Sequence, residues 1–352
     1  MKANIKPSRK FLFINLVIII LSFACSDSQT GYNKSMKGSL MGIYFPDKYN
    51  GWAVGAYGAI FHTSDAGRSW SSQNSGINTN LYSVFFYNSN IGYTSGSSGI
   101  LLKTTNGGKN WFKDRIPLSN HTNYIIGNDS CDLLFEISSS TAYKKRIYKI
   151  YSSNNRDYLW TQFSIGIIAD LSDFSVSLFK TSYFALNSES NNTEIYKIGD
   201  KDKIGILLGS TDVNIENISF INDKTGWISS DNSIYRTTNS GKTWTNTWTW
   251  KDTTITKNVK VPTINKLYFI NETLGFAAGY LADNVSFIRK TIDGGTSWKT
   301  VFEPRGKTDD YFAEYIYDIQ FTDSQQGYAV GGLQNKIIQT SDCGESWVVI
   351  NP

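Results

Sequence analysis

An eight-residue motif, T-x-[DN]-x-G-x-x-W, recurs along this 352-residue chain and limits its fold more than any other feature. Five good copies occupy residues 63–70, 104–111, 237–244, 291–298 and 340–347, and a degenerate copy, SNNRDYLW, occupies residues 153–160. The tryptophans that end the six copies are Trp70, Trp111, Trp160, Trp244, Trp298 and Trp347. Because 84 residues separate Trp160 from Trp244, about twice the usual spacing, we expect one more unit without the motif between them.

A second pattern precedes each good copy in a constant register. A phenylalanine is followed six residues later by glycine and a second aromatic residue. The five instances are Phe45 with Gly51-Trp52, Phe86 with Gly92-Tyr93, Phe220 with Gly226-Trp227, Phe269 with Gly275-Phe276, and Phe321 with Gly327-Tyr328. The two patterns together predict four strands in each unit. Strand A ends at the phenylalanine, and after a turn rich in Asp, Asn and Ser, strand B begins at the glycine. Strand C ends at the threonine of the motif, and strand D begins near its tryptophan.

The long gap between Trp160 and Trp244 contains four further strand-like segments, at residues 173–177, 183–187, 194–198 and 204–209. With them the chain has seven units, which predicts an all-β fold: a seven-bladed β-propeller of four-stranded antiparallel blades over residues 38–352. A linear stack of the same units would need polar capping repeats, and neither end of the chain has one. How the ring is closed stays open, including whether residues 26–37 add a strand to the last blade.

The N-terminus has the pattern of an export signal. A basic head, residues 2–10, precedes a mainly apolar stretch, residues 11–24, which is short for a permanent membrane span. The segment Ser22-Phe23-Ala24-Cys25 resembles the end of a bacterial lipoprotein signal, although Ser22 stands where that family usually has leucine. The resemblance implies a signal peptide at 1–24, lipidation of Cys25, a linker at 25–37, and a protein anchored by lipid in the bacterial cell envelope, at the outer membrane or cell surface.

The charge of the chain argues against nucleic acid as a partner. Lys and Arg total 34 against 30 Asp and Glu, but four of the basic residues lie in the predicted signal peptide. The remaining chain is formally neutral, so it lacks the positive field that phosphate binding requires. Beyond Cys25 only Cys131 and Cys343 remain, and two cysteines do not make a disulfide framework.

The eight-residue motif resembles the Asp-box, also called the bacterial neuraminidase repeat. The whole unit is similar to the photosystem II assembly and stability factor family, which implies a propeller and a role in assembling membrane complexes. Similar boxes also occur in sialidases and other glycan-active enzymes, so the box indicates fold and not activity. Within such a turn an Asp or Asn oxygen can accept backbone N–H groups, glycine allows a positive φ, and the tryptophan can lie between neighbouring sheets. We therefore predict a structural role for Asp65, Trp70, Asn106, Trp111, Asn155, Trp160, Asn239, Trp244, Asp293, Trp298, Asp342 and Trp347.

No catalytic residue, metal site or cofactor is predicted. The tripeptide Arg115-Ile116-Pro117 matches one found in sialidases, but it follows the second box where that family has it before the first blade. The chain has only two histidines, His62 and His121, which disfavours a transition-metal site. Carboxylate pairs drawn from different blades cannot be recognised from sequence spacing, so a carbohydrate-active hydrolase or a glycan-binding protein, sialidase-like or otherwise, remains the alternative.

The favoured function is a non-catalytic scaffold that binds a protein partner or a membrane-complex subunit, or else a glycan. Partners of propellers usually meet the face that carries the D-to-A and B-to-C loops, opposite the boxes. The longest such loops predict a mixed aromatic and charged binding face made of Trp250, Lys251, Arg305, Asp309, Asp310 and Tyr311. The competing interpretation for Trp250 is that it packs with Trp248 on an outer strand.

Overall fold

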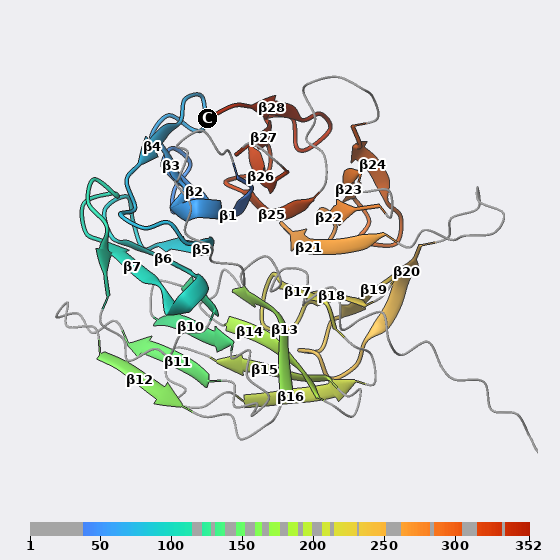
Figure 1. Cartoon of the computed structure of the whole chain (residues 1–352). Coiled ribbons are helices and arrows are strands. Elements are labelled where there is room, and N and C mark those ends of the chain that lie inside the picture. The colour runs from blue at the N-terminus through green and yellow to red at the C-terminus, as the bar shows by residue number, and fades with distance from the viewer. Residues whose placement is uncertain are drawn as a thin grey trace, which may run out of the picture. The chain divides into compact units, whose positions relative to one another are not determined.

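The computed structural model describes residues 38–114, 122–127, 131–137, 146–151, 159–163, 169–176, 182–188, 193–198, 206–211, 215–230, 232–250, 262–281, 285–304, 315–332 and 335–352. Lys37–Pro352 form one compact unit. Its strands make seven four-stranded antiparallel sheets, and each sheet is built from four strands that are consecutive in the chain. The all-β propeller predicted from the repeats is confirmed (Figure 1).

The first two sheets each carry a short 3-10 turn between their second and third strands. Sheet one contains β1 (Leu40–Tyr44), β2 (Gly51–Gly55), η1 (Ala56–Gly58), β3 (Ile60–Thr63) and β4 (Ser71–Gln73). Sheet two contains β5 (Leu81–Phe86), β6 (Gly92–Gly96), η2 (Ser97–Gly99), β7 (Leu101–Thr104) and β8 (Phe112–Lys113). Sheet three contains β9 (Thr122–Gly127), β10 (Cys131–Ile137), β11 (Arg146–Tyr151) and β12 (Leu159–Phe163).

The fourth sheet is the unit expected in the long gap, and its four strands fall where the sequence predicted them, with small shifts at their ends. Sheet four contains β13 (Ala169–Val176), β14 (Ser182–Ser188), β15 (Thr193–Ile198) and β16 (Ile206–Thr211). Sheet five contains β17 (Asn217–Phe220), β18 (Gly226–Ser230), β19 (Ser233–Thr237) and β20 (Thr245–Thr249). Sheet six contains β21 (Thr263–Phe269), β22 (Gly275–Tyr280), β23 (Ser286–Thr291) and β24 (Lys299–Phe302). Sheet seven contains β25 (Ile316–Phe321), β26 (Gly327–Gly331), β27 (Ile337–Thr340) and β28 (Val348–Ile350).

The constant spacing from phenylalanine to glycine has a steric cause. In the sixth blade Phe269 and Gly275 are paired directly across the hairpin of β21 and β22. The ring of Phe269 lies on the glycine, and an added Cβ at Gly275 would overlap the ring. Gly51, Gly92, Gly226 and Gly327 lie under Phe45, Phe86, Phe220 and Phe321 in the same way. The glycine therefore makes room for a ring that belongs to the core between two blades.

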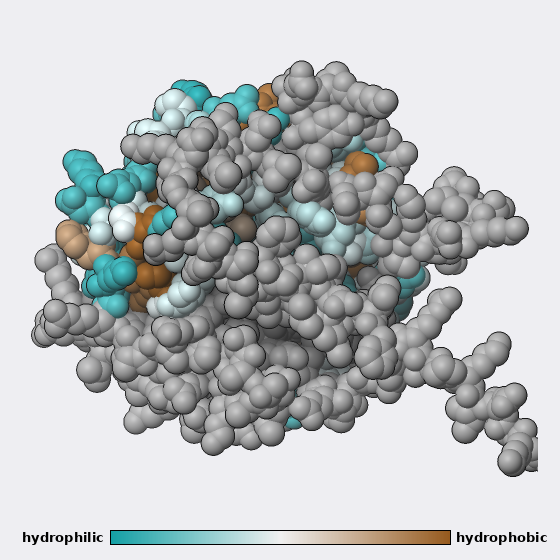
Figure 2. Space-filling model, viewed as in Figure 1, coloured by the Kyte–Doolittle hydropathy of each residue, from teal (hydrophilic) through white to brown (hydrophobic). Residues whose placement is uncertain are grey.

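Stacked aromatic rings join neighbouring blades. The aromatic residue after the glycine lies flat on the phenylalanine of the next blade: Trp227 stacks on Phe269 with ring centroids 3.6 Å apart and planes at 2°. Equivalent stacks pair Trp52 with Phe86, Phe276 with Phe321, and Tyr328 with Phe45. Trp52, Trp227, Phe276 and Tyr328 are fully buried. In Figure 2 hydrophilic and hydrophobic residues lie side by side on the visible surface of the described part. The stacked rings supply the main apolar contact between blades.

The box tryptophans take a second position at the same interfaces. Trp298 meets the edge of Phe269 at 6.0 Å and 84°, and Trp347 meets Phe321 at 5.9 Å and 86°. Trp70, Trp244, Trp298 and Trp347 are half-buried, whereas Trp111 is buried. The box tryptophans thus lie edge-on beside the stack, and the central wedge between blades is the aromatic residue that follows the glycine.

The ring closes by contact between the first and last blades. β1 lies against β25 and β26 (Figure 1), so a linear stack is ruled out. The carboxylate of Asp318 accepts the Ile43 N–H at 3.1 Å, and the side-chain amide of Gln320 accepts the Phe45 N–H at 2.9 Å and donates to the Phe45 carbonyl at 3.2 Å. Among the described residues the last sheet consists of β25 to β28, all from the C-terminal part of the chain.

Candidate functional site

Each box turn is organised by its threonine and its acidic or amide side chain. In the first box the Thr63 hydroxyl donates to Asp65 Oδ1 at 2.8 Å and accepts the Gly67 N–H at 2.9 Å. Asp65 in turn accepts the Ser69 N–H at 2.9 Å and the Ser69 hydroxyl at 2.6 Å. Thr104, Thr237, Thr291 and Thr340 hold Asn106, Asn239, Asp293 and Asp342 in the same way.

Two consecutive residues of every described box turn have a left-handed backbone. In the last box these are Cys343 at φ 62° and Gly344 at φ 76°, and in the second box they are Gly107 at φ 70° and Gly108 at φ 80°. The second of the two is always glycine, which explains why the motif fixes that position. The first is Ala66, Gly107, Ser240, Gly294 or Cys343, so Cys343 holds a turn position that glycine fills in two other blades.

A second turn, between strands A and B, supports each box turn. The Asn271 side-chain oxygen accepts the N–H groups of Thr273 and Leu274 at 2.9 and 2.8 Å, and the Thr273 carbonyl then accepts the Gly294 N–H of the box at 2.9 Å. Asp47, Asn88, Asn222 and Asp323 occupy the same position in four other blades. These five residues are missed by the sequence analysis, although each stands two places after the recurring phenylalanine.

The hydrogen bonds of the box turns keep their carboxylates ionised. The Ser69 hydroxyl and N–H lower the pKa of Asp65 to about 2, and Ser346 does the same for Asp342, with a pKa of about 2. Burial opposes ionisation at Asp293, but hydrogen bonds from Ser297 outweigh it, so that pKa is also lowered. Such groups are poor proton donors near neutral pH, which favours a structural role over acid catalysis.

The lowered pKa values predict a loss of stability in acid. A carboxylate that is more acidic in the folded than in the unfolded chain stabilises the fold fully above its unfolded pKa, near 3.8, and this stabilisation disappears as the pH falls through about 2. We expect the urea midpoint to fall between about pH 4 and pH 2. Changing Asp65, Asp293 and Asp342 together to Asn, which two other boxes already contain, should flatten that fall. An equally steep fall of the urea midpoint in the triple variant would show that these three carboxylates are not the cause.

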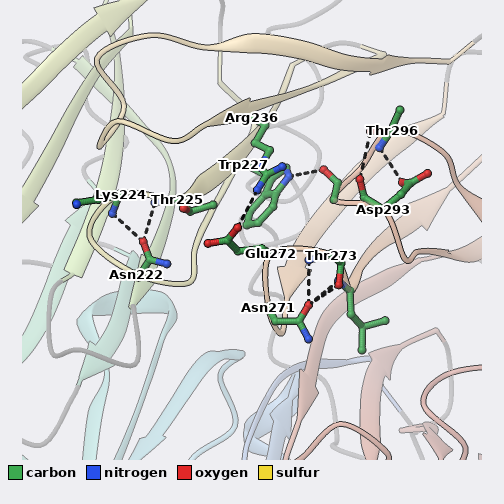
Figure 3. Close-up of polar contacts among 12 residues, drawn as sticks. Asn222, Lys224, Thr225, Trp227, Arg236, Asn271, Glu272, Thr273, Asp293 and Thr296 are labelled. Atoms are coloured by element: carbon green, nitrogen blue, oxygen red, sulfur yellow. Dashed lines mark hydrogen bonds and ion pairs between the residues drawn. The ribbon is translucent and has the colours of Figure 1, made fainter.

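Polar contacts clamp the fifth blade to the sixth on the side of the box turns (Figure 3). The indole N–H of Trp227 donates to the Gly294 carbonyl, in the box of the next blade, at 2.8 Å. The guanidinium of Arg236 lies 5.3 Å from the centre of the Trp227 ring and forms an ion pair with Glu272 at 3.4 Å. Trp227 and Arg236 therefore join the fifth blade to the sixth, while Asn222 and Asn271 in Figure 3 hydrogen-bond within their own turns.

An open groove of about 580 Å³ lies beside the outer strand of the fifth blade. Its lining is Asn246, Thr247, Trp248 and Thr249 from β20 with Arg289 and Trp298 from the sixth blade. The Arg289 guanidinium lies over Trp250 at 3.5 Å and near Trp248 at 5.8 Å from the ring centres. The groove thus combines aromatic surface, hydroxyl and amide groups, and one cation.

The structure describes one of the six residues predicted to form the binding face. Trp250 is buried, with 9% of its surface exposed, and packs edge-on against Trp248 at 5.4 Å and against Phe287 at 5.6 Å. Its ring therefore contributes to the core beneath the groove. Lys251, Arg305, Asp309, Asp310 and Tyr311 lie outside the described residues, as do Cys25 and Asn155. Trp160 lies at the start of β12, so its place in the chain, but not its side chain, is described.

Among the described residues, no group of three or more His, Cys, Asp or Glu side chains could hold a metal ion. The same part of the chain contains no helix with the length and apolar character of a membrane span. The groove beside β20 is the candidate site, because its lining combines two indole rings with polar side chains and the Arg289 guanidinium.

Comparisons with known proteins agree with the fold. The family model described as photosynthesis system II assembly factor YCF48 matches residues 29–200, just under half of the chain. A comparison with curated proteins finds no significant match. YCF48 bound to a D1 peptide shares 18% identity at a TM-score of 0.61, covering 90% of this chain and 99% of that chain.

Two further solved structures have the same architecture. YCF48 from Cyanidioschyzon merolae shares 16% identity at a TM-score of 0.62, covering 88% of this chain and 97% of that chain. The WD40 propeller domain of Doa1 shares 11% identity at a TM-score of 0.59, covering 89% of this chain and 96% of that chain. The chain therefore has the propeller fold of the YCF48 structures and, over residues 29–200, is similar to the YCF48 family.

Proposed function

We propose that this protein is a non-catalytic scaffold that binds a segment of a partner protein. The observation that carries the proposal is the likeness of its whole propeller to YCF48 in a structure with a bound D1 peptide. The partial match to the assembly-factor family points the same way. The box turns agree, because their carboxylates are held ionised by hydrogen bonds that build the turn.

We further propose that the scaffold works at the bacterial cell envelope, held there by a lipid on Cys25. The support is the sequence pattern alone: a basic head, an apolar stretch and a small residue before the cysteine. A lipid on Cys25 would hold the propeller at the membrane surface. This placement suits an assembly factor for membrane complexes.

The test uses the full chain expressed with its own signal and extracted from membranes with detergent. Crosslinking before extraction is expected to yield a defined partner protein, and the Cys25→Ala variant is expected to leave the membrane fraction. A screen of labelled glycosides and sialosides should give no turnover. Turnover in that screen would instead support the carbohydrate-active alternative, and the absence of any crosslinked protein would overturn the scaffold.

A further inference from the structure

The outer strand of the fifth blade has an unpaired edge. In the part of the chain that the structure describes, β20 hydrogen-bonds to β19 and to no strand on its other side. The Trp250 N–H donates inward to the Asn232 carbonyl at 2.7 Å. Successive N–H groups of a strand point in opposite directions, so the Thr249 N–H faces outward, away from the sheet. This edge can accept a further strand.

A β-bulge lies in the strand that borders the groove, and β24 has a bulge at the matching position. Trp248 pairs with Ile234 and Asn246 pairs with Tyr235, so Thr247 is an extra residue in β20. A bulge redirects side chains, and here four consecutive residues, Asn246 to Thr249, line one groove. The groove is completed by Trp298, which is half-buried and whose indole N–H bonds to the Gly295 carbonyl at 3.1 Å.

β20 is longer than the outer strands of the four other blades with complete motifs, while β12 also has five residues and β16 has six. β20 has five residues, while β4 has three, β8 two, β24 four and β28 three. Short outer strands protect a sheet from pairing with other chains, and β20 lacks that protection. Its polar residues Asn246 and Thr249 hydrogen-bond to each other at 3.1 Å, so the surface of the strand is already ordered.

We propose that an extended segment of the partner protein pairs with β20 as a fifth strand of this blade and rests an apolar side chain on Trp248 and Trp298. The inference rests on the proposed protein-binding function and gives it a site. Backbone hydrogen bonds to the unpaired edge supply affinity, as in other strand-addition complexes, and the two tryptophans select the side chain.

The probe for this site is a phage library of random linear peptides selected on the full, detergent-solubilised chain. Selected peptides should carry an aliphatic or aromatic residue within an extended sequence. Binding of these peptides should slow amide hydrogen exchange in β20 and leave the exchange rates in β24 unchanged. Asn246→Lys places a charge on the edge without altering the backbone and should weaken binding about tenfold or more. Thr300→Lys, at the matching position of β24 and equally exposed, should bind as wild type.

The possible results separate this site from the general function. Peptides whose binding ignores Asn246→Lys and leaves exchange in β20 unchanged would overturn the strand-addition site. A library that yields no binder would also overturn the site. So would glycans on an array that bind the protein and that no selected peptide displaces. In each of these cases a partner protein crosslinked to the full chain would still leave the scaffold function standing. If no protein is crosslinked either, both proposals are wrong.

Discussion

Trp227→Ala is expected to destabilise the protein by about 3–5 kcal/mol, because it empties the middle of the interface between the fifth and sixth blades. The indole is fully buried and stacks on Phe269. Its N–H also donates to the Gly294 carbonyl, which would lose a partner inside the protein. Urea denaturation of the wild type and of the variant, followed by far-UV circular dichroism, measures the difference in their free energies of unfolding.

Two comparisons make this prediction specific. Trp298→Ala removes a half-buried box tryptophan from the same interface and should cost about half as much, near 2 kcal/mol. Trp227→Phe should cost about 1 kcal/mol more than Trp52→Phe, because the Trp52 N–H has no hydrogen-bond partner among the described residues. If Trp298→Ala proved the more damaging change, the box tryptophan would be the main wedge, as the motif alone suggested.

The repeats were enough to predict the fold, because strand positions follow from local rules. The glycine must face a phenylalanine across a hairpin, and the threonine hydroxyl must reach the Asp or Asn side chain two places later, so both patterns occur at fixed spacing in the chain. Strand C ends at the threonine and strand D begins after the tryptophan in each of the five complete units, as predicted. The fourth blade lacks the box, but its sequence contains four strand-like segments, so it could still be recognised as a unit.

The interface chemistry could not be predicted in the same way. Which blade a ring touches depends on how sheets face one another, and no spacing in the sequence reports that. The closure of the ring through Asp318 and Gln320 joins residues that lie 275 positions from their partners. The strand that borders the groove has a bulge at Thr247, and bulges leave no clear mark in sequence. Trp250 was therefore predicted at a binding face, while the structure buries it beneath Arg289.

Gly279→Ala is expected to destabilise the protein by about 3 kcal/mol or more. In the sixth blade Ile264 pairs with Gly279 and Lys266 with Ala278, so Asn265 is an extra residue in the inner strand β21. This bulge brings the Thr263 carbonyl against Gly279, and an added Cβ would overlap that oxygen. The oxygen belongs to the backbone of a paired strand and cannot turn aside as a side chain can. The bulge itself would have to rearrange.

The fifth blade supplies the matched control, because it has a serine at this place. β17 and β18 pair without a register shift, and Ser230 fits at the end of β18 with its Cβ present. Ser230→Ala should therefore change the free energy of unfolding by less than about 1 kcal/mol. In the fourth blade a bulge at the same place stands opposite Leu186, so the prediction for Gly279 depends on how closely the Thr263 carbonyl approaches it in the sixth blade. If Gly279→Ala were as mild as Ser230→Ala by urea denaturation, the inner strand would be adaptable, and the bulge would not be the reason for the glycine.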